Sequence, residues 1–424
     1  MKYTFRIMFV AMAAAIALGM GSCSDDEFTE SIFDDTEYPL DRSLATFPLD
    51  TFVKKNFLEP YNLQYLYKMQ DIGSNMDYNL VPCTYDQSVN LAVLCKYLWY
   101  DVYKECVGEE FLKMYSPRII HVIGSPAFNP SSGTMLLGTA EGGLKITLYN
   151  ANALKADDIE LLNEWFFKTM HHEFSHILNQ RYNRPTDFDL ISNGKYNTVS
   201  WQDTPDSVAL SQGFISPYAS SQQREDWVEV IANYIVKDTV YWNQMMETAS
   251  YQWEHVTDVD ATTFKSYFKS YDENNTNPSA WVLKSGINRD SVGYYVRVSS
   301  TSNGNAASYA VQRKAIQRDA DNKWAVPDEN GNIVYLTSQG FIGRDVIQEK
   351  LKYVRDWLQE NFNYNLEDVR MGVQHRQWAT DENGKFILDA DGHFQNNLIY
   401  VRPDGTTVLD ELKAEVEKYK ELQK

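Results

Sequence analysis

The segment His171-His172-Glu173-Phe174-Ser175-His176 contains side chains that can bind a metal ion and transfer a proton. Its pattern is His-Glu-x-x-His, with His172 and His176 four residues apart. On a helix, residues four apart lie on one face, one turn above the other. The two imidazoles could therefore bind one Zn²⁺, each at about 2.0–2.1 Å. Glu173 lies about 100° around such a helix, where it would act as general base on a metal-held water rather than as a ligand.

The residues around this motif predict the helix that must carry it, over residues 158–179. An apolar stripe at helical spacing runs through the segment, formed by Phe166, Met170, Phe174 and Ile177. His172 and His176 point away from that stripe. The helix would bury one face and present both imidazoles on the other. The alternative is a histidine-rich surface helix that binds no metal.

A second helix, predicted over residues 221–237, supplies a third metal ligand. A catalytic zinc site needs three protein ligands and an open position, and no histidine follows His176 at a nearby spacing. Glu225 and Glu229 stack on one stripe of this otherwise apolar helix, which requires a cation or a partner there. We assign Glu225 as the third ligand and Glu229 as the carboxylate that orients an imidazole N–H. Glu229 as the ligand is the alternative, and Asp226 is expected to favour the positive helix N-terminus.

These residues resemble the gluzincin metallopeptidases, in which a glutamate ligand follows the His-Glu-x-x-His helix. More closely, the chain is similar to the Bacteroidetes zinc metallohydrolase lipoproteins associated with substrate import, a family of zinc-binding metallopeptidases. The similarity covers most of residues 46–280 and one later helix. The matching stretches are residues 54–61, 80–82, 124–126, 137–143, 171–176, 213–219, 225–232 and 346–360.

The resemblance implies an α+β, zincin-like fold, with a small mixed sheet over the zinc helix and a mainly helical lower lobe. It implies peptide-bond hydrolysis with one Zn²⁺ and with Glu173 as general base. In the lethal-factor-like gluzincins a tyrosine seven residues before the glutamate ligand stabilises the oxyanion. Tyr218 stands seven residues before Glu225. A packed residue beside Pro217 is the alternative for Tyr218.

The first residues are typical of a targeting segment. Lys2 and Arg6 precede an apolar run that is too short to span a bilayer. It ends in Met20-Gly21-Ser22-Cys23, which resembles a bacterial lipobox, so Cys23 would become the lipidated first residue. The acidic Ser24-Asp25-Asp26-Glu27 looks like the surface-export signal of Bacteroidetes lipoproteins. We expect an outer-membrane lipoprotein that faces outward and contacts the membrane only through its lipid anchor.

Composition excludes some partners and the resemblance suggests others. The formal net charge of −19 argues against nucleic acid and against anionic lipid headgroups. Besides Cys23 there are three cysteines, Cys83, Cys95 and Cys106; an odd number cannot all pair, and we interpret them as buried small hydrophobes. The expected partners are a peptide or protein substrate and a TonB-dependent importer with its surface lipoprotein. The alternatives are a non-catalytic surface lipoprotein that binds substrate, and hydrolysis of a non-peptide amide.

The chain divides into a signal peptide (1–22), an acidic tether (23–45), a zincin-like metallohydrolase domain (46–285), a strand-rich insertion (286–340) and a helical and hairpin C-terminal region (341–424). Helices are predicted over residues 88–106, 109–115, 345–361, 366–375 and 408–422. Strands are predicted over residues 119–124, 134–137, 144–149, 386–388 and 398–401. Residues 138–143 are predicted to form a turn or, alternatively, a strand that pairs with an extended substrate. Residues 181–211 are expected to be irregular.

Overall fold

The computed structural model describes residues 40–69, 78–128, 135–136, 138–141, 144–249, 343–390 and 392–423, and six short strands between residues 268 and 335. The predicted signal peptide and Cys23 lie outside the described residues. The chain divides into two units, Met1–Phe47 and Pro48–Lys424, and the site belongs to the second. The five-part division of the sequence stays a prediction. No helix in the described part combines the length and apolar character needed to cross a membrane.

Two helical runs carry the candidate site. The first consists of α7 (Ile159–Leu162), the π-helical turn η4 (Asn163–Phe167) and α8 (Lys168–Arg181). It begins where Asp158 accepts a hydrogen bond from the backbone N–H of Leu161 at 2.9 Å, which satisfies a backbone donor that the helix leaves free. The second consists of the 3₁₀ turn η6 (Tyr218–Ser221) and α11 (Gln223–Val236). Both predicted helices are therefore confirmed, with ends shifted by one or two residues.

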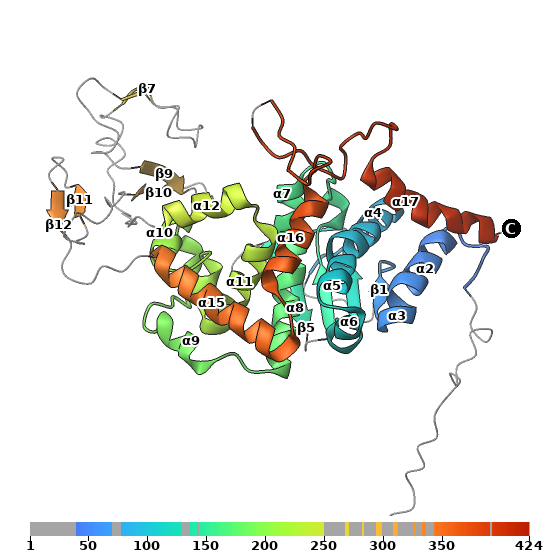
Figure 1. Cartoon of the computed structure of the whole chain (residues 1–424), viewed down its shortest axis with the longest axis horizontal. Coiled ribbons are helices and arrows are strands. Elements are labelled where there is room, and N and C mark those ends of the chain that lie inside the picture. The colour runs from blue at the N-terminus through green and yellow to red at the C-terminus, as the bar shows by residue number, and fades with distance from the viewer. Residues whose placement is uncertain are drawn as a thin grey trace, which may run out of the picture. The chain divides into compact units, whose positions relative to one another are not determined.

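Further helices surround these two runs. They are α2 (Phe47–Val53), η1 (Lys54–Leu58), α3 (Glu59–Tyr61), α4 (Tyr85–Cys95), η2 (Lys96–Tyr100), α5 (Asp101–Cys106), α6 (Glu109–Tyr115), η3 (Ala151–Ala153), α9 (Thr186–Ile191), η5 (Trp201–Asp203), α10 (Asp206–Ser211), α12 (Thr239–Thr248), α15 (Gly343–Phe362), α16 (Leu366–Gln377), α17 (Val408–Glu417) and η8 (Lys418–Gln423). In Figure 1, α8 and α11 lie at the centre of the helices, with α15 and α16 beside them.

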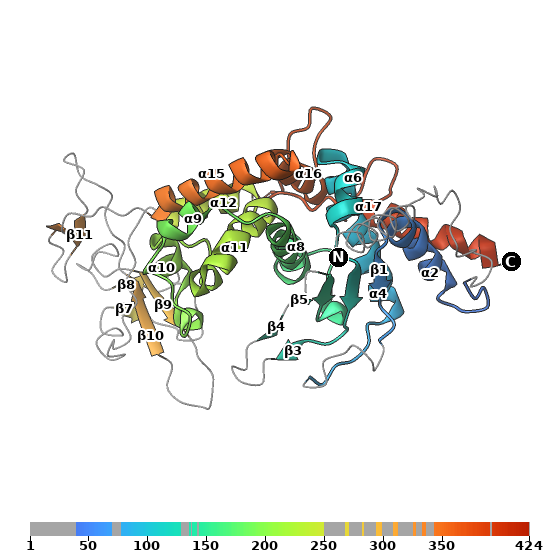
Figure 2. The same cartoon turned by 90° about the horizontal axis from the view of Figure 1, so that it is seen from below.

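A small mixed sheet lies on the other side of α8. Its order is β1 (Gln64–Leu66), β2 (Ile119–Val122), β6 (Lys145–Leu148) and β5 (Gly138–Glu141). The first three strands are parallel, and β5 pairs antiparallel to β6. Figure 2 shows α8 between α11 and this sheet. A side chain at Gly138 would begin 2.2 Å from the Thr169 side chain, so only glycine lets β5 approach α8 this closely.

The remaining strands form short antiparallel pairs. They are β3 (Ala127–Phe128) with β4 (Met135–Leu136), β7 (Phe268–Ser270) with β8 (Val282–Leu283), β9 (Tyr294–Val298) with β10 (Ser308–Gln312), and β11 (Ala325–Pro327) with β12 (Ile333–Tyr335). The last two pairs fall in the predicted strand-rich segment. Helices with one small mixed sheet confirm the predicted α+β fold class.

The core explains why α8 presents its histidines to α11. Phe166, Met170 and Phe174 have no exposed surface, and only 4% of Ile177 is exposed. Burying each such side chain contributes about 1.5–3 kcal/mol, so the apolar stripe sets the rotation of the helix. The ring of Phe174 meets Trp99 edge-on, with centroids 4.9 Å apart. The predicted stripe is therefore confirmed.

Three local predictions are wrong or incomplete. Residues 138–141 form the strand β5, the alternative stated above, rather than a turn, because pairing with β6 supplies their backbone hydrogen bonds; pairing with a substrate stays a prediction. The irregular segment 181–211 contains α9 and α10, which begin after Pro185 and Pro205. The predicted strands at 386–388 and 398–401 are absent from the described residues, where isolated bridges such as Thr380 with Phe386 occur instead. Cys83, Cys95 and Cys106 are free thiols, but only Cys95 is buried as predicted, whereas Cys83 and Cys106 are partly exposed.

Candidate metal centre

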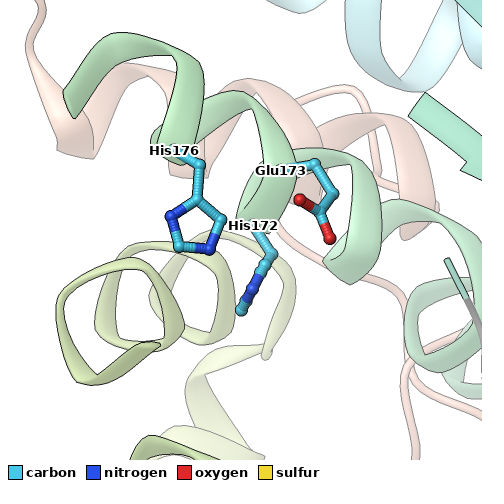
Figure 3. Close-up of side chains that lie close together, drawn as sticks. All are labelled: His172, Glu173 and His176. Carbon is cyan, nitrogen blue, oxygen red and sulfur yellow. The ribbon is translucent and has the colours of Figure 1, made fainter. Parts of the chain in front are cut away.

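His172 and His176 lie one turn apart on α8, and their imidazoles extend toward α11 (Figure 3). Both side chains are almost fully buried. Nδ1 of His176 has no hydrogen-bond partner within the part of the chain that the structure describes. Two imidazoles held one turn apart in a buried site are typical ligands for a transition metal ion.

Glu225, in the first turn of α11, brings a carboxylate oxygen to both imidazoles. Its Oε2 atom lies 3.1 Å from Nε2 of His172 and 3.3 Å from Nε2 of His176. Ligands about 2.0–2.1 Å from a tetrahedral zinc ion are about 3.3 Å from one another. The Glu225 oxygen thus lies from each imidazole nitrogen at the separation expected for two zinc ligands, and the residues present fit the ion. Gln222 donates to the other oxygen of Glu225 at 3.3 Å.

Glu229 lies one turn further along α11 and binds the opposite side of the His172 ring. Its Oε1 atom is 2.8 Å from Nδ1 of His172. Its Oε2 atom accepts from Ser216 Oγ at 2.6 Å and from Asn233 Nδ2 at 3.1 Å. Because the carboxylate can only accept, Nδ1 of His172 carries a proton and donates it to Glu229, so that Nε2 is the ring nitrogen left to bind an ion beside Glu225.

The electrostatics of these groups favour a positive charge at the centre. Burial lowers the pKa of His172, but its hydrogen bonds to Glu225 and Glu229 outweigh burial and raise that pKa to about 10. Burial raises the pKa of Glu229, but the nearby charge of Lys168 and the bond to His172 outweigh it, so that pKa falls to about 2. The pKa of Glu225 is also lowered, because its bonds to His172 and His176 outweigh burial. Such a set of groups suits a divalent cation.

Glu173 lies beside the two histidines rather than between them and α11 (Figure 3). One potential ligand atom from each of Glu173, His172 and His176 lies within 4.8 Å of the others. Burial raises the pKa of Glu173, although the two histidines oppose the shift. A carboxylate with a raised pKa is a stronger base near neutral pH. The position suits proton transfer next to a bound ion.

Tyr218 is brought to the same place by η6. Its ring stacks on the ring of His172, with centroids 5.9 Å apart and an interplanar angle of 29°, while 37% of the residue stays exposed. Burial raises the pKa of Tyr218, and the Glu225 carboxylate, which hydrogen-bonds it, raises it further. The phenol is therefore protonated and able to donate. Cys23 lies outside the described residues.

Asp226 lies in the first turn of α11, at the helix N-terminus where it was expected. It is also fully buried and lies 2.6 Å from Nζ of Lys350 on α15, a partner that the sequence did not indicate. It also accepts a hydrogen bond from Tyr196 at 2.9 Å. Lys350 donates a further bond to the backbone oxygen of Gly213 at 2.7 Å. This cation therefore holds the first turn of α11 and the loop that leads to Tyr218.

Sequence reasoning missed several residues that support the centre. Ser216 lies in the same Gly-Phe-Ile-Ser-Pro-Tyr-Ala segment as Tyr218, and that segment was the only signal for it. Trp201, whose ring lies 4.9 Å from that of Tyr218, stands alone in a polar stretch with no periodic pattern. Lys350 belongs to an amphipathic helix whose one other lysine, Lys352, is 76% exposed, so the burial of Lys350 has no sequence signal.

Comparison with known proteins shows which protein family the chain resembles. A family model described as "Putative zinc-binding metallo-peptidase" matches residues 43–367. Among solved structures, the chain is similar to one described as "a putative zinc-binding metallo-peptidase from Bacteroides caccae ATCC 43185", with 27% identity and a TM-score of 0.51. That match covers 82% of this chain and 95% of the other. The comparison with curated proteins found no match.

The family match extends over well more than half of the chain and includes every residue described above at the candidate centre. The solved structure has the same family description, and the similarity extends over nearly all of its length. The family is described as zinc-binding, which agrees with the distances from the Glu225 oxygen to the two imidazole nitrogens. The chain belongs to the family described as putative zinc-binding metallo-peptidases.

Proposed function

We propose that this protein is a zinc-dependent peptidase. The observation that carries the proposal is the convergence of one Glu225 oxygen on Nε2 of both His172 and His176, with Glu173 beside them. His172, His176 and Glu225 would hold a single ion. Glu229 would fix the orientation of His172, since both of its oxygens are engaged. A site with only a structural role would need the ligands but no base at the position of Glu173.

In the proposed reaction, the ion and the residues of the chain would have separate roles. A bound Zn²⁺ would polarise the scissile carbonyl and lower the pKa of the attacking water. Glu173 would accept a proton from that water and pass it to the leaving amine. The Tyr218 hydroxyl would donate a hydrogen bond to the oxygen of the carbonyl as negative charge develops there. β5, the last strand of the sheet and next to α8, would pair with an extended peptide.

We also propose that the protein acts at the cell surface. Lipidation of Cys23 would anchor it in the outer membrane, and the acidic residues after Cys23 support an outward orientation. Its partners would be a peptide or protein substrate and a TonB-dependent importer with its surface lipoprotein. Radiolabelled palmitate incorporated by the wild type and not by Cys23→Ala would support the anchor. Equal incorporation by both would contradict it.

Metal removal tests the central proposal. The purified protein is expected to contain about one zinc per chain, to cleave members of a peptide library, to lose cleavage on chelation and to regain it when Zn²⁺ is restored. Elemental analysis and mass spectrometry of the library measure both properties. No zinc after reconstitution would contradict the proposal and favour a non-catalytic binding lipoprotein. If the protein contains zinc but cleaves no peptide, the alternative of hydrolysing a non-peptide amide would be favoured.

Glu229→Gln is expected to weaken zinc binding by about 10–100-fold. The glutamine would place an NH₂ group where the structure has a carboxylate oxygen that accepts from Ser216 and Asn233, or would turn it toward Nδ1 of His172. Either arrangement disturbs the orientation of the imidazole. Competition with a chelator of known affinity measures the change. Glu247→Gln, an exposed substitution on α12, is the control, and equal affinities for the two variants would contradict this role.

A further inference from the structure

An aromatic surface adjoins the candidate centre on the side of η6. Tyr218 stacks on His172, and the ring of Trp201 packs against Tyr218 with an interplanar angle of 63°. Both Trp201 and Tyr218 keep solvent-exposed surface. His172, Tyr218 and Trp201 therefore form a continuous row of ring contacts from the candidate centre to two partly exposed residues.

The segment that carries Trp201 is held in place by hydrogen bonds. The backbone N–H of Asn197 donates to the backbone oxygen of Ser220 at 2.7 Å, which ties this segment to η6. The side-chain oxygen of Asn197 accepts from the N–H and the hydroxyl of Ser200, each at 3.1 Å. The N–H of Thr204 closes the turn onto the carbonyl of Trp201 at 3.0 Å. Trp201 is thus positioned before any substrate arrives.

The start of the segment is fixed as well. Tyr196 donates to the buried Asp226 at 2.9 Å, and its ring packs against Phe214 with centroids 5.2 Å apart. Asp226 directly follows Glu225 in the first turn of α11. The segment is therefore attached both to η6 and to the first turn of α11. Because this segment is already ordered, less conformational entropy is lost when a substrate binds to it.

We propose that Trp201 and Tyr218 form a substrate subsite that takes an aromatic or large apolar side chain next to the scissile bond. The proposal rests on the peptidase function proposed above and names the substrate class of that site. Aromatic rings prefer edge-to-face or offset contact with further aromatic rings, and the exposed faces of this pair offer that contact beside the centre.

Two fluorogenic peptides that differ only in one residue flanking the scissile bond, Phe or Ala, test this subsite. The wild type is expected to have a kcat/KM about 10–100-fold higher for the Phe peptide, the range that a hydrophobic pocket supplies. Trp201→Ala is expected to lower the ratio of the two kcat/KM values (Phe peptide over Ala peptide) by at least about tenfold, mainly because KM for the Phe peptide rises. Trp201→Phe is expected to retain most of the ratio. Val199→Ala is the control, because Val199 lies in the same segment and is 88% exposed.

The outcomes separate the subsite from the proposed peptidase function. If Trp201→Ala lowers kcat/KM equally for both peptides, the residue is merely structural and the subsite is refuted. If the wild type cleaves neither peptide, calorimetric binding of the two peptides to the full-length protein replaces turnover as the readout. Tighter binding of the Phe peptide that is lost in Trp201→Ala would then support the subsite even though hydrolysis had failed. Equal binding of both peptides would overturn it.

Discussion

Replacing Glu173 by glutamine is expected to lower peptide hydrolysis by about 10²–10⁴-fold, the contribution of a positioned general base. Glutamine has nearly the same shape but cannot accept a proton from water at neutral pH. The zinc content should stay near that of the wild type, because the three converging ligand atoms belong to His172, His176 and Glu225. Turnover of a cleaved peptide and elemental analysis of the same preparation provide the two measurements.

Glu225→Ala is the matched comparison for this experiment. It removes a carboxylate whose Oε2 atom approaches both imidazoles, so zinc and turnover should be lost together. The two variants thereby separate proton transfer from metal binding. If Glu173→Gln keeps full activity, the role of base belongs to another group. If it loses zinc as Glu225→Ala does, Glu173 is a ligand, a possibility that its closeness to the histidines makes worth testing.

The parts of this protein that could be predicted from sequence are those set by local geometry. The spacing of His172 and His176 and the apolar stripe through Phe174 follow from the helical repeat. The stacking of Glu225 and Glu229 on α11 follows from the same repeat. The α+β fold class followed from the family resemblance carried by these motifs. The assigned roles of these residues stay predictions until they are measured.

The parts that could not be predicted depend on contacts between distant segments. β5 has a glycine-rich sequence with weak strand preference, and it becomes a strand because β6 pairs with it and Thr169 leaves no room for a side chain at Gly138. Trp201 lies by Tyr218 because a backbone hydrogen bond from Asn197 joins their segments. No periodic pattern records the contact of Gly138 with Thr169 or the bond from Asn197 to Ser220, since these partners are distant in the chain.

Lys350 is the strongest example, because a lysine on an amphipathic helix is normally solvated. Here the side chains of Lys350 and Asp226 are both 0% exposed, with Nζ 2.6 Å from the carboxylate. Burial lowers the pKa of Lys350 and raises the pKa of Asp226, and their mutual attraction opposes both shifts. Nζ also lies 4.2 Å from the centroid of the Phe214 ring. The pair joins α15 to the first turn of α11, next to Glu225.

Lys350→Met is therefore expected to lower the free energy of unfolding by about 3–5 kcal/mol, the usual cost of leaving a buried charge without its partner. The Gly213 carbonyl would lose its donor as well. Urea unfolding in the presence of a chelator measures the loss without a contribution from bound metal. Adding Asp226→Asn should recover much of the stability, because asparagine removes the unpaired charge and still accepts from Tyr196.

Lys352→Met provides the control on the same helix. Lys352 is 76% exposed and pairs with Asp356 at 2.8 Å, and an exposed pair contributes only about 0–1 kcal/mol. A similar loss in both variants would mean that helix propensity or net charge, rather than the buried pair, sets the stability of α15. A large loss confined to Lys350→Met, and relieved by Asp226→Asn, would mean that the late helix stabilises the turn holding Glu225. Weaker zinc binding by Lys350→Met would then follow from the same contact, although Lys350 touches none of the ligands.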